Sequence, residues 1–182
     1  MPGVKERMPS AVALGMFDGM HIGHRQVIAR AVALARENGW QSVVYTFENH
    51  PRSVYAQPPQ QLMSAQERRA AMLDMGVDRV DMVHFDMQMA RTTPQAFLDE
   101  LAQRYQLKAL VAGSDYTFGY KGLGTVQTLR EMEPRYGYIL QVVPFVMLEG
   151  EKVSSTRIRQ ALDRGERALA DQMLGKEIHS EK

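Results

Sequence analysis

Segments with the pattern of buried strands alternate along this chain with segments that have the spacing of amphipathic helices. Ala11–Leu14, Gln41–Phe47 and Ala109–Ala112 are short, mostly apolar runs, which is typical of strands covered on both faces. Between the first two, Gln26–Asn38 repeats its apolar residues at helical spacing and ends at Gly39. Strands joined through helices predict βαβ units, and therefore a mostly parallel sheet with helices on both faces.

The same patterns continue along the rest of the chain. Further elements are expected as follows: helices from the capping box Ser64–Glu67 to Gly76, from Thr93 and Pro94 to Tyr105, and at Thr125–Met132, Ser154–Leu162 and Glu166–Leu174; strands at Arg79–Phe85 and Tyr138–Val143; a loop at Gly113–Gly124; a hairpin at Val146–Val153. We therefore expect an α/β fold, a Rossmann-like doubly wound parallel sheet with a small C-terminal appendage. Ligands of such sheets bind where the strand order reverses, which indicates the loops after Leu14 and Ala112.

Length and composition exclude several functional classes. The 182 residues fit one domain, which we assign to residues 1–175 with a polar tail at 176–182. Without Cys there is no disulfide framework, thiolate zinc site or Cys nucleophile. A net charge of +1 gives no general field for nucleic acid. The sequence shows no apolar run of about 18 residues and no signal peptide, so we expect a cytoplasmic protein that does not bind a membrane. We also expect no obligate protein partner. The 13 Met are expected to fill the core or, alternatively, to line an apolar pocket.

The loop after the first strand holds the residues best suited to chemistry. It reads Gly15-Met-Phe-Asp-Gly-Met-His-Ile-Gly-His24. His21 and His24 are three residues apart at an expected helix start, so they face the same side. Free N–H groups at a helix start favour an anion such as a nucleotide phosphate. Gly23 in a helical turn costs roughly 1 kcal/mol relative to Ala, which indicates a functional reason for it.

Two other interpretations of this histidine pair stay open. H-x-x-H is also a zinc-binding spacing, but zinc needs a third ligand, and neither His50, His84 nor a carboxylate stands at a spacing that supports one. The pair is also consistent with a purely structural role. The loop is neither a P-loop nor a G-x-G-x-x-G dinucleotide fingerprint.

The signature loop resembles that of the H-x-G-H nucleotidylyltransferase superfamily, and its F-D-G-x-H-x-G-H form is most similar to bacterial FAD synthetases, the adenylyltransferase module of bifunctional riboflavin kinase/FAD synthetases. Four further segments resemble motifs of the same family in order: Phe47–Pro51 (F-x-x-H-P), Leu62–Ser64 with Met75–Asp78 (L-T-S and L-G-V-D), Gly113–Gly119 (G-x-[ND]-[FY]-x-F-G) and Val153–Arg159 (I-S-S-T-x-I-R). The resemblance extends from about Ala11 to Gly175.

The resemblance implies an enzyme that transfers AMP from ATP to FMN, with Mg²⁺, and releases FAD and pyrophosphate. A phosphate monoester is largely ionised at neutral pH because its second pKa is about 6, so no general base or covalent intermediate is required. The site has to align the reactants and stabilise developing charge. The resembled enzymes continue into a riboflavin kinase module, which we expect to be absent here, so the chain should not phosphorylate riboflavin.

The resemblance also implies roles for individual residues. The expected catalytic residues are His21, His24 and Arg159, with the histidines on the α- and β-phosphates and the arginine on the β- and γ-phosphates. Additional expected ATP contacts are Phe17, Asp18, Gly19, Ser154, Ser155, Thr156 and Arg157. Expected FMN contacts are His50, Pro51, Asp115, Phe118 and Lys121. Mg²⁺ is expected to be held mainly by phosphates, with Asp115 as a candidate ligand.

Several of these residues also have a purely structural interpretation. Ser154–Thr156 is consistent with simple N-capping, and Asp18 with an Asx-type bond inside its own loop. Phe118 and Pro51 are consistent with ordinary packing and turn formation. Lys121 lies between glycines, so it belongs either to a mobile flap over substrate or to a solvated loop.

Two other functions stay open on the sequence alone. One is an H-x-G-H transferase for another acceptor, such as a sugar-alcohol phosphate, pantetheine phosphate or nicotinate mononucleotide. The other is a non-catalytic nucleotide- or flavin-binding module. The segments Ser114–Gly119 and His50-Pro51 favour a flavin acceptor, and the intact pair His21 and His24 favours catalysis.

Overall fold

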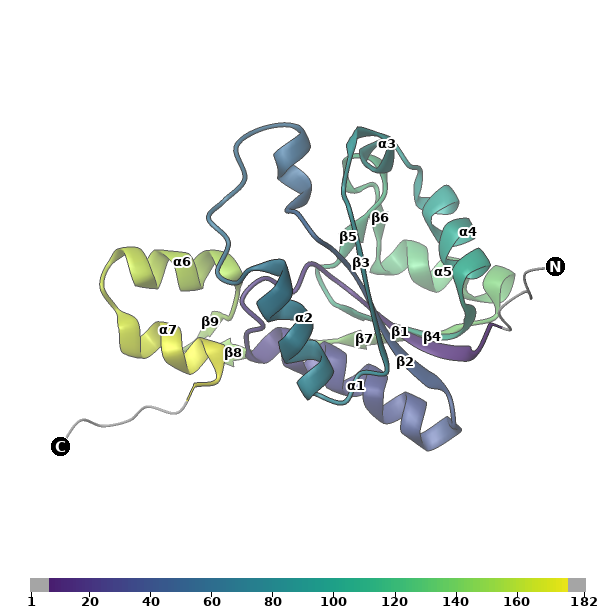
Figure 1. The fold of residues 1–182 in the computed structure, drawn as a ribbon, viewed down its shortest axis with the longest axis horizontal. Coiled ribbons are helices and arrows are strands. Elements are labelled where there is room, and N and C mark those ends of the chain that lie inside the picture. Colours follow the sequence, from purple (N-terminus) through teal and green to yellow (C-terminus); the bar gives the residue numbers. More distant parts are fainter. Residues whose placement is uncertain (1–6, 177–182) are drawn as a thin grey trace.

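The computed structural model describes residues 7–176 and contains a five-stranded parallel sheet between two layers of helices (Figure 1). The strands of the sheet are β1 (Pro9–Leu14), β2 (Gln41–Phe47), β3 (Arg79–Val83), β4 (Gln106–Gly113) and β7 (Ile139–Val143). Their order is β3-β2-β1-β4-β7, and every neighbouring pair is parallel. The chain thus moves outward from β1 to β3 and returns to β4 beside β1. The strand order reverses between β1 and β4, as predicted, and the Rossmann-like fold is confirmed.

The remaining elements surround this sheet. They are the helices α1 (Ile22–Asn38), α2 (Ala65–Asp74), α3 (Met87–Ala90), α4 (Pro94–Arg104), α5 (Val126–Tyr136), α6 (Ser155–Asp163) and α7 (Arg167–Leu174), the short 3₁₀ helices η1 (Pro51–Val54) and η2 (Tyr120–Gly122), and the short strands β5 (Thr117–Phe118), β6 (Gly124–Thr125), β8 (Met147–Leu148) and β9 (Glu151–Lys152). Two predicted caps are confirmed: Ser64 and Glu67 form a reciprocal capping box, and Thr93 caps α4.

Alternate side chains of the strands build two cores, one on each face of the sheet. Ala11 and Ala13 of β1 pack in the core that contains α1 and α2. Val12 and Leu14 pack in the opposite core with α4 and α5. This period of two, repeated in β2 and β4, requires apolar residues on both faces, which explains why the sequence of these strands is mostly apolar.

The C-terminal appendage has a small core of its own. The strands β8 and β9 form the predicted hairpin, and α6 and α7 lie beside it at one end of the sheet (Figure 1). Val153, Ile158, Ala161, Ala170 and Met173 are buried there, against side chains of α1 and of the segment before α2. The appendage therefore packs on the same end of the sheet as the loop that follows β1.

Several predicted boundaries or elements differ from the structure, including the starts of β1 at Pro9 and β4 at Gln106, two and three residues earlier than predicted. The helix α1 begins at Ile22 rather than Gln26, because the side chain of His21 caps it. The segment Gly113–Gly124 contains the β5–β6 hairpin and is not plain loop. The strand β3 ends at Val83, before Phe85, and α5 continues beyond Met132 to Tyr136. The elements η1 and α3 were not predicted, since four residues are too few to show a period.

Within residues 7–176, no helix combines the length and the apolar character that a membrane span requires.

Candidate active site

The loop after β1 is built around the side chain of His21. This residue is the N-cap of α1, and its Nδ1 accepts a hydrogen bond from the backbone N–H of His24 at 3.2 Å. The imidazole lies against Gly23: a Cβ added there would come 3.0 Å from Cε1 of His21. Gly23 therefore lets the ring lie closer to the helix than a larger residue would without a shift of the ring. Phe17, Gly19 and Met20 have positive φ angles of 56°, 82° and 47°, which fold the loop tightly onto itself.

The two histidine rings of the signature are stacked. The centroids of His21 and His24 are 3.4 Å apart, and the edge of the Phe17 ring supports His24 with centroids 5.5 Å apart. Burial lowers the pKa of His21 to about 4. Burial and the nearby charges of His21 and Arg68 hold the pKa of His24 well below its usual value. Both rings are therefore neutral at pH 7, and because Nδ1 of His21 accepts a bond, its proton is on Nε2.

A main cavity of about 370 Å³ opens at the carboxyl ends of β1, β4 and β7. It combines predicted site residues from four separate segments of the chain, namely Phe17, His21, His24, Pro51, Asp115, Ser154 and Ser155. The starts of α1 and α6 both contribute to its wall through Gly23 and Ser154. The first N–H groups of each helix have no acceptor inside the helix, so this cavity is suited to an anion with several phosphates.

Lys152 is a cavity residue that the sequence analysis missed. It lies on β9, and its ammonium pairs with the carboxylate of Asp115 across the cavity wall and lies 4.0 Å from the centroid of the Phe145 ring. All three side chains line the main cavity. The available signal was a cation placed immediately before the Val153–Arg159 motif.

Asp18 connects the signature loop to two distant segments. Its carboxylate is 3% exposed and accepts hydrogen bonds from the backbone N–H groups of Leu62 at 3.0 Å and Met63 at 3.2 Å, and from Nη2 of Arg159 at 2.5 Å. The hydroxyl of Ser155 donates to the carbonyl oxygen of Asp18 at 2.8 Å. The bonds thus extend far beyond the loop, and the interpretation of Asp18 as a local Asx-type turn is wrong.

The two arginines of the last motif lie outside the lining of the main cavity. Arg159 binds Asp18 and donates from Nε to the carbonyl oxygen of Gln60 at 2.6 Å. Arg157 donates from Nη1 to the carbonyl oxygens of Leu148 and Glu151, both at 3.0 Å, and so holds the β8–β9 hairpin against α6. Three other predicted ATP contacts, Asp18, Gly19 and the exposed Thr156, are also outside that lining.

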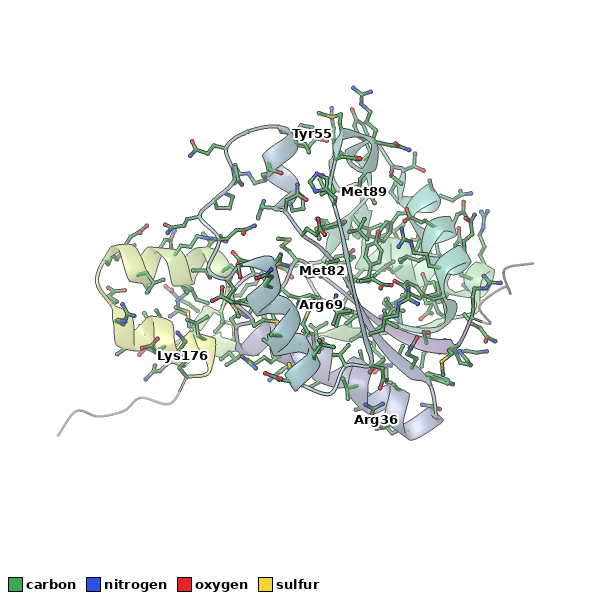
Figure 2. All side chains as sticks on the ribbon, viewed as in Figure 1. Arg36, Tyr55, Arg69, Met82, Met89 and Lys176 are labelled. Carbon is green, nitrogen blue, oxygen red and sulfur yellow. The ribbon has the colours of Figure 1, made fainter. Side chains whose placement is uncertain are left out.

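A second cavity of about 330 Å³ adjoins the first. The two share Phe47, Pro51, Tyr116 and Thr117. Its wall is largely aromatic, with Tyr55, Phe85, Phe97 and Phe118 among its residues, and it also includes the predicted residues Pro51 and Lys121. Figure 2 shows Tyr55 and Met89, which both line this cavity, on neighbouring elements at the top of the view.

The remaining predicted flavin contacts have defined structural partners. Phe118 is only 6% exposed and packs on Phe97 and Tyr116. Lys121 lies over the ring of Tyr120, 5.2 Å from its centroid. His50 lines neither cavity; it caps η1 by accepting the backbone N–H of Arg52 at 3.1 Å, and burial, together with the charge of Arg159, lowers its pKa.

Among the residues that the structure describes, no three His, Asp or Glu side chains gather closely enough to hold a metal ion. Asp115 is the one carboxylate in the described lining of the main cavity. A single carboxylate is the donor set with which Mg²⁺ is commonly bound when phosphates supply its other ligands.

The comparison with protein families shows to which family this chain belongs. The model of the family described as FAD synthetase matches residues 4–157. This chain belongs to the FAD synthetase family. In this chain the signature loop, the segment Phe47–Pro51 and the loop after β4 are parts that meet at the two cavities.

Individual relatives agree with the family assignment. The chain is 35% identical over 167 residues to a bifunctional riboflavin kinase/FMN adenylyltransferase of Listeria monocytogenes and 33% identical over 175 residues to that of Bacillus subtilis. These matches cover 90% and 94% of this chain but 53% and 55% of the relatives, so the chain spans about half their length. A crystal structure described as a macrolide-efflux protein from Streptococcus pneumoniae superposes with a TM-score of 0.83 at 33% identity, over 92% of this chain and 57% of that one.

Proposed function

We propose that this chain transfers AMP from ATP to FMN, giving FAD and pyrophosphate. The observation that supports this best is the pair of adjoining cavities, because the main cavity offers groups for phosphates and the second has the aromatic walls that a flavin ring requires. The reaction joins two phosphates, so its two substrates must meet where the cavities share Pro51 and Thr117.

ATP is proposed to occupy the main cavity. Nε2–H of His21 and the ring of His24 donate to the α- and β-phosphates, and Lys152 exchanges Asp115 for a phosphate oxygen. Ser154 and Ser155 also line this cavity, at the start of α6. Their hydroxyls are proposed to lie near the charge of the ATP phosphates. Neutral histidines suit this role because they donate hydrogen bonds that strengthen as negative charge builds on the leaving pyrophosphate.

The isoalloxazine ring of FMN is proposed to enter the second cavity. Phe118 supports its wall, Pro51 separates the ring from the phosphate, and Lys121 borders the entrance. His50 shapes this region through η1 rather than by direct contact. Asp115 stands in the main cavity close to the shared wall, where it either contacts the flavin side or faces the magnesium ion that accompanies ATP.

The proposed reaction needs alignment more than acid–base chemistry. An oxygen of the FMN phosphate attacks the α-phosphorus of ATP, a new bond forms, and the bond from that phosphorus to the bridging oxygen breaks as pyrophosphate leaves. Magnesium, bound through the phosphates of ATP, neutralises charge on them. The chain itself holds the reactants in line and excludes water. Arg159 acts in this scheme through Asp18, whose carboxylate it holds, and not on a phosphate.

The test is to incubate purified protein with FMN, ATP and Mg²⁺ and to look for FAD by chromatography. FAD formed in proportion to protein supports the proposal, and no FAD with any divalent metal overturns it. Thermal shifts with other phosphate acceptors, such as pantetheine phosphate and nicotinate mononucleotide, separate the alternatives: stabilisation by one of these and not by FMN would assign a different acceptor.

A further inference from the structure

Arg68, on α2, is a buried cation to which the sequence analysis gave no role. Its side chain is 0% exposed. In the part of the chain that the structure describes, it forms no ion pair within 4.0 Å. Burial lowers the pKa of Arg68, and the charge of Asp18 opposes that effect. Burying a charge without an ion-pair partner costs free energy of folding. The presence of a buried arginine at this position therefore needs an explanation.

The guanidinium of Arg68 connects the ends of two neighbouring strands. Nη1 donates to the carbonyl oxygen of Met16 at 2.9 Å, just beyond β1. Nη2 donates to the carbonyl oxygens of Phe47 at 2.9 Å and Glu48 at 3.0 Å, at the end of β2. The hydroxyl of Thr46 adds a second bond to the Met16 oxygen at 3.1 Å. The planar fork of an arginine donates from two separate nitrogens, which lets it reach the ends of both strands, whereas the donors of a lysine share one nitrogen.

Two of the three residues whose carbonyls bind Arg68 belong to the wall of the main cavity. Met16 and Phe47 both line it, and Phe47 also lines the second cavity. Met16 precedes Phe17, whose ring supports His24. Arg68 is therefore directly behind the wall on which the stacked histidines rest. Burial is the main cause of the lowered pKa of His24, and the charges of His21 and Arg68 add to it.

Resting on the function proposed above, we propose that Arg68 is a positioning residue for AMP transfer: its guanidinium fixes the ends of β1 and β2 so that Phe17 holds His24, and its charge favours an anion in the main cavity. Arg68 touches neither substrate in this scheme. Its effect passes through the backbone at Met16 and through His24.

Two variants separate the hydrogen bonds of Arg68 from its charge. Arg68→Met keeps most of the packing volume and removes both the hydrogen bonds and the charge. Arg68→Lys keeps the charge, but its single nitrogen cannot replace donors on two separate nitrogens. Arg69→Met is the matched control, because the neighbouring Arg69 on α2 is exposed and binds only the carbonyl oxygen of Val80 on β3 (Figure 2). Each variant is assayed with saturating ATP and FMN well below its Tm, so that nearly all molecules are folded.

We expect kcat to fall about 10- to 100-fold in both Arg68 variants, as small misplacements in an aligned site do, and to stay unchanged in Arg69→Met. A merely structural role would lower Tm and leave the kcat of folded protein unchanged. Wild-type kcat in folded Arg68→Met or Arg68→Lys overturns the proposal, and so does failure of both variants to fold.

The titration of the His24 imidazole by NMR, in protein without ligand, is the second readout. The other charged or titratable groups near the ring pair are His21, stacked on His24, and Asp18, Asp115 and Lys152, which face His21. We expect the pKa of His24 to rise in Arg68→Met and to stay near its wild-type value in Arg68→Lys and Arg69→Met. An unchanged pKa of His24 in Arg68→Met overturns the proposed electrostatic effect of Arg68. Because this readout needs no turnover, it still tests Arg68 if wild-type protein makes no FAD and the proposed function fails.

Discussion

The carboxylate of Asp18 binds the guanidinium of Arg159, 141 residues further along the chain, with 2.5 Å between Oδ2 and Nη2. Both groups are largely buried, with exposed side-chain fractions of 3% and 17%. Through this pair the loop after β1 is joined to α6, and the carbonyl oxygen of Gln60 and the N–H of Leu62 complete the connection. The signature loop and the C-terminal appendage thus form one structural unit beside the main cavity.

Asp18→Asn is expected to destabilise the protein. Removing one partner of a buried, hydrogen-bonded ion pair costs about 3–5 kcal/mol, since the remaining charge stays buried. Glu151→Gln is the control, because the carboxylate of Glu151 is 73% exposed and its pair with Arg157 is worth at most about 1 kcal/mol. Urea unfolding of both variants measures the difference. Equal stability of the two would contradict the bridging role of Asp18.

His21→Asn is expected to remove activity with little loss of stability. Asn is a good N-cap, so α1 keeps its start while the imidazole that donates to phosphate is lost; losing one such donor lowers kcat about 10²- to 10³-fold. The control is His84→Ala, whose side chain is 68% exposed and pairs with Glu48 outside the cavities. Steady-state assays of FAD formation measure kcat for both variants. Wild-type turnover by His21→Asn would show that the role assigned to His21 is wrong.

Gly23→Ala should move stability and activity in opposite directions. Alanine favours a helix over glycine by about 1 kcal/mol. Its methyl group, however, would come 3.0 Å from Cε1 and 3.1 Å from Nδ1 of His21, so the ring must shift. We expect at least about a tenfold loss of kcat with unchanged or higher Tm. A variant with wild-type kcat would mean that the ring position over Gly23 has no catalytic importance.

The stability of the protein without ligand should fall as the pH is lowered from about 6.5 to about 4. His21 has a folded-state pKa of about 4 against the usual 6.5. Between these values the unfolded chain binds the proton and the folded chain does not, so acid favours unfolding, by up to about 3 kcal/mol for His21 alone. Urea unfolding at pH 7 and pH 4.5 measures the slope. His21→Asn should flatten it, whereas His84→Ala should leave it unchanged; an equal slope in wild type and His21→Asn would refute the assignment.

Lys152→Met is expected to raise the KM for ATP more than it lowers kcat. Its ammonium is proposed to move from Asp115 to a phosphate oxygen, and a charged hydrogen bond of this kind contributes about 1.5–3 kcal/mol, or roughly a tenfold or larger rise in KM. The matched control is Lys176→Met, since Lys176 is 64% exposed beyond α7. The initial rate at varied ATP and fixed FMN distinguishes them. An unchanged KM would place ATP elsewhere.

Much of the fold followed from patterns that local physics dictates. The alternation of strand segments such as Gln41–Phe47 with helical segments predicted a parallel sheet, because strands joined through helices are parallel and carry apolar residues on both faces. The capping box at Ser64 and Glu67 and the hairpin turn at Glu149-Gly150 were also predicted, since each depends on neighbouring residues only. Of the site, the sequence by itself determined the histidine pair, the helix starts that favour phosphate, and the family resemblance.

Only the tertiary structure decided how these parts meet. Arg159 and Asp18 were expected to contact ATP, and only the structure shows that they also bind each other across 141 residues of the chain. Arg157 binds the carbonyl oxygens of the nearby β8–β9 hairpin. Arg68 gave no local signal, since a buried arginine has the same sequence neighbourhood as an exposed one, and for Lys152 the only signal was its place before the Val153–Arg159 motif. The physical reason is that capping and periodicity are set within a few residues, whereas burial and charge pairing depend on segments that the fold brings together from far apart in the chain.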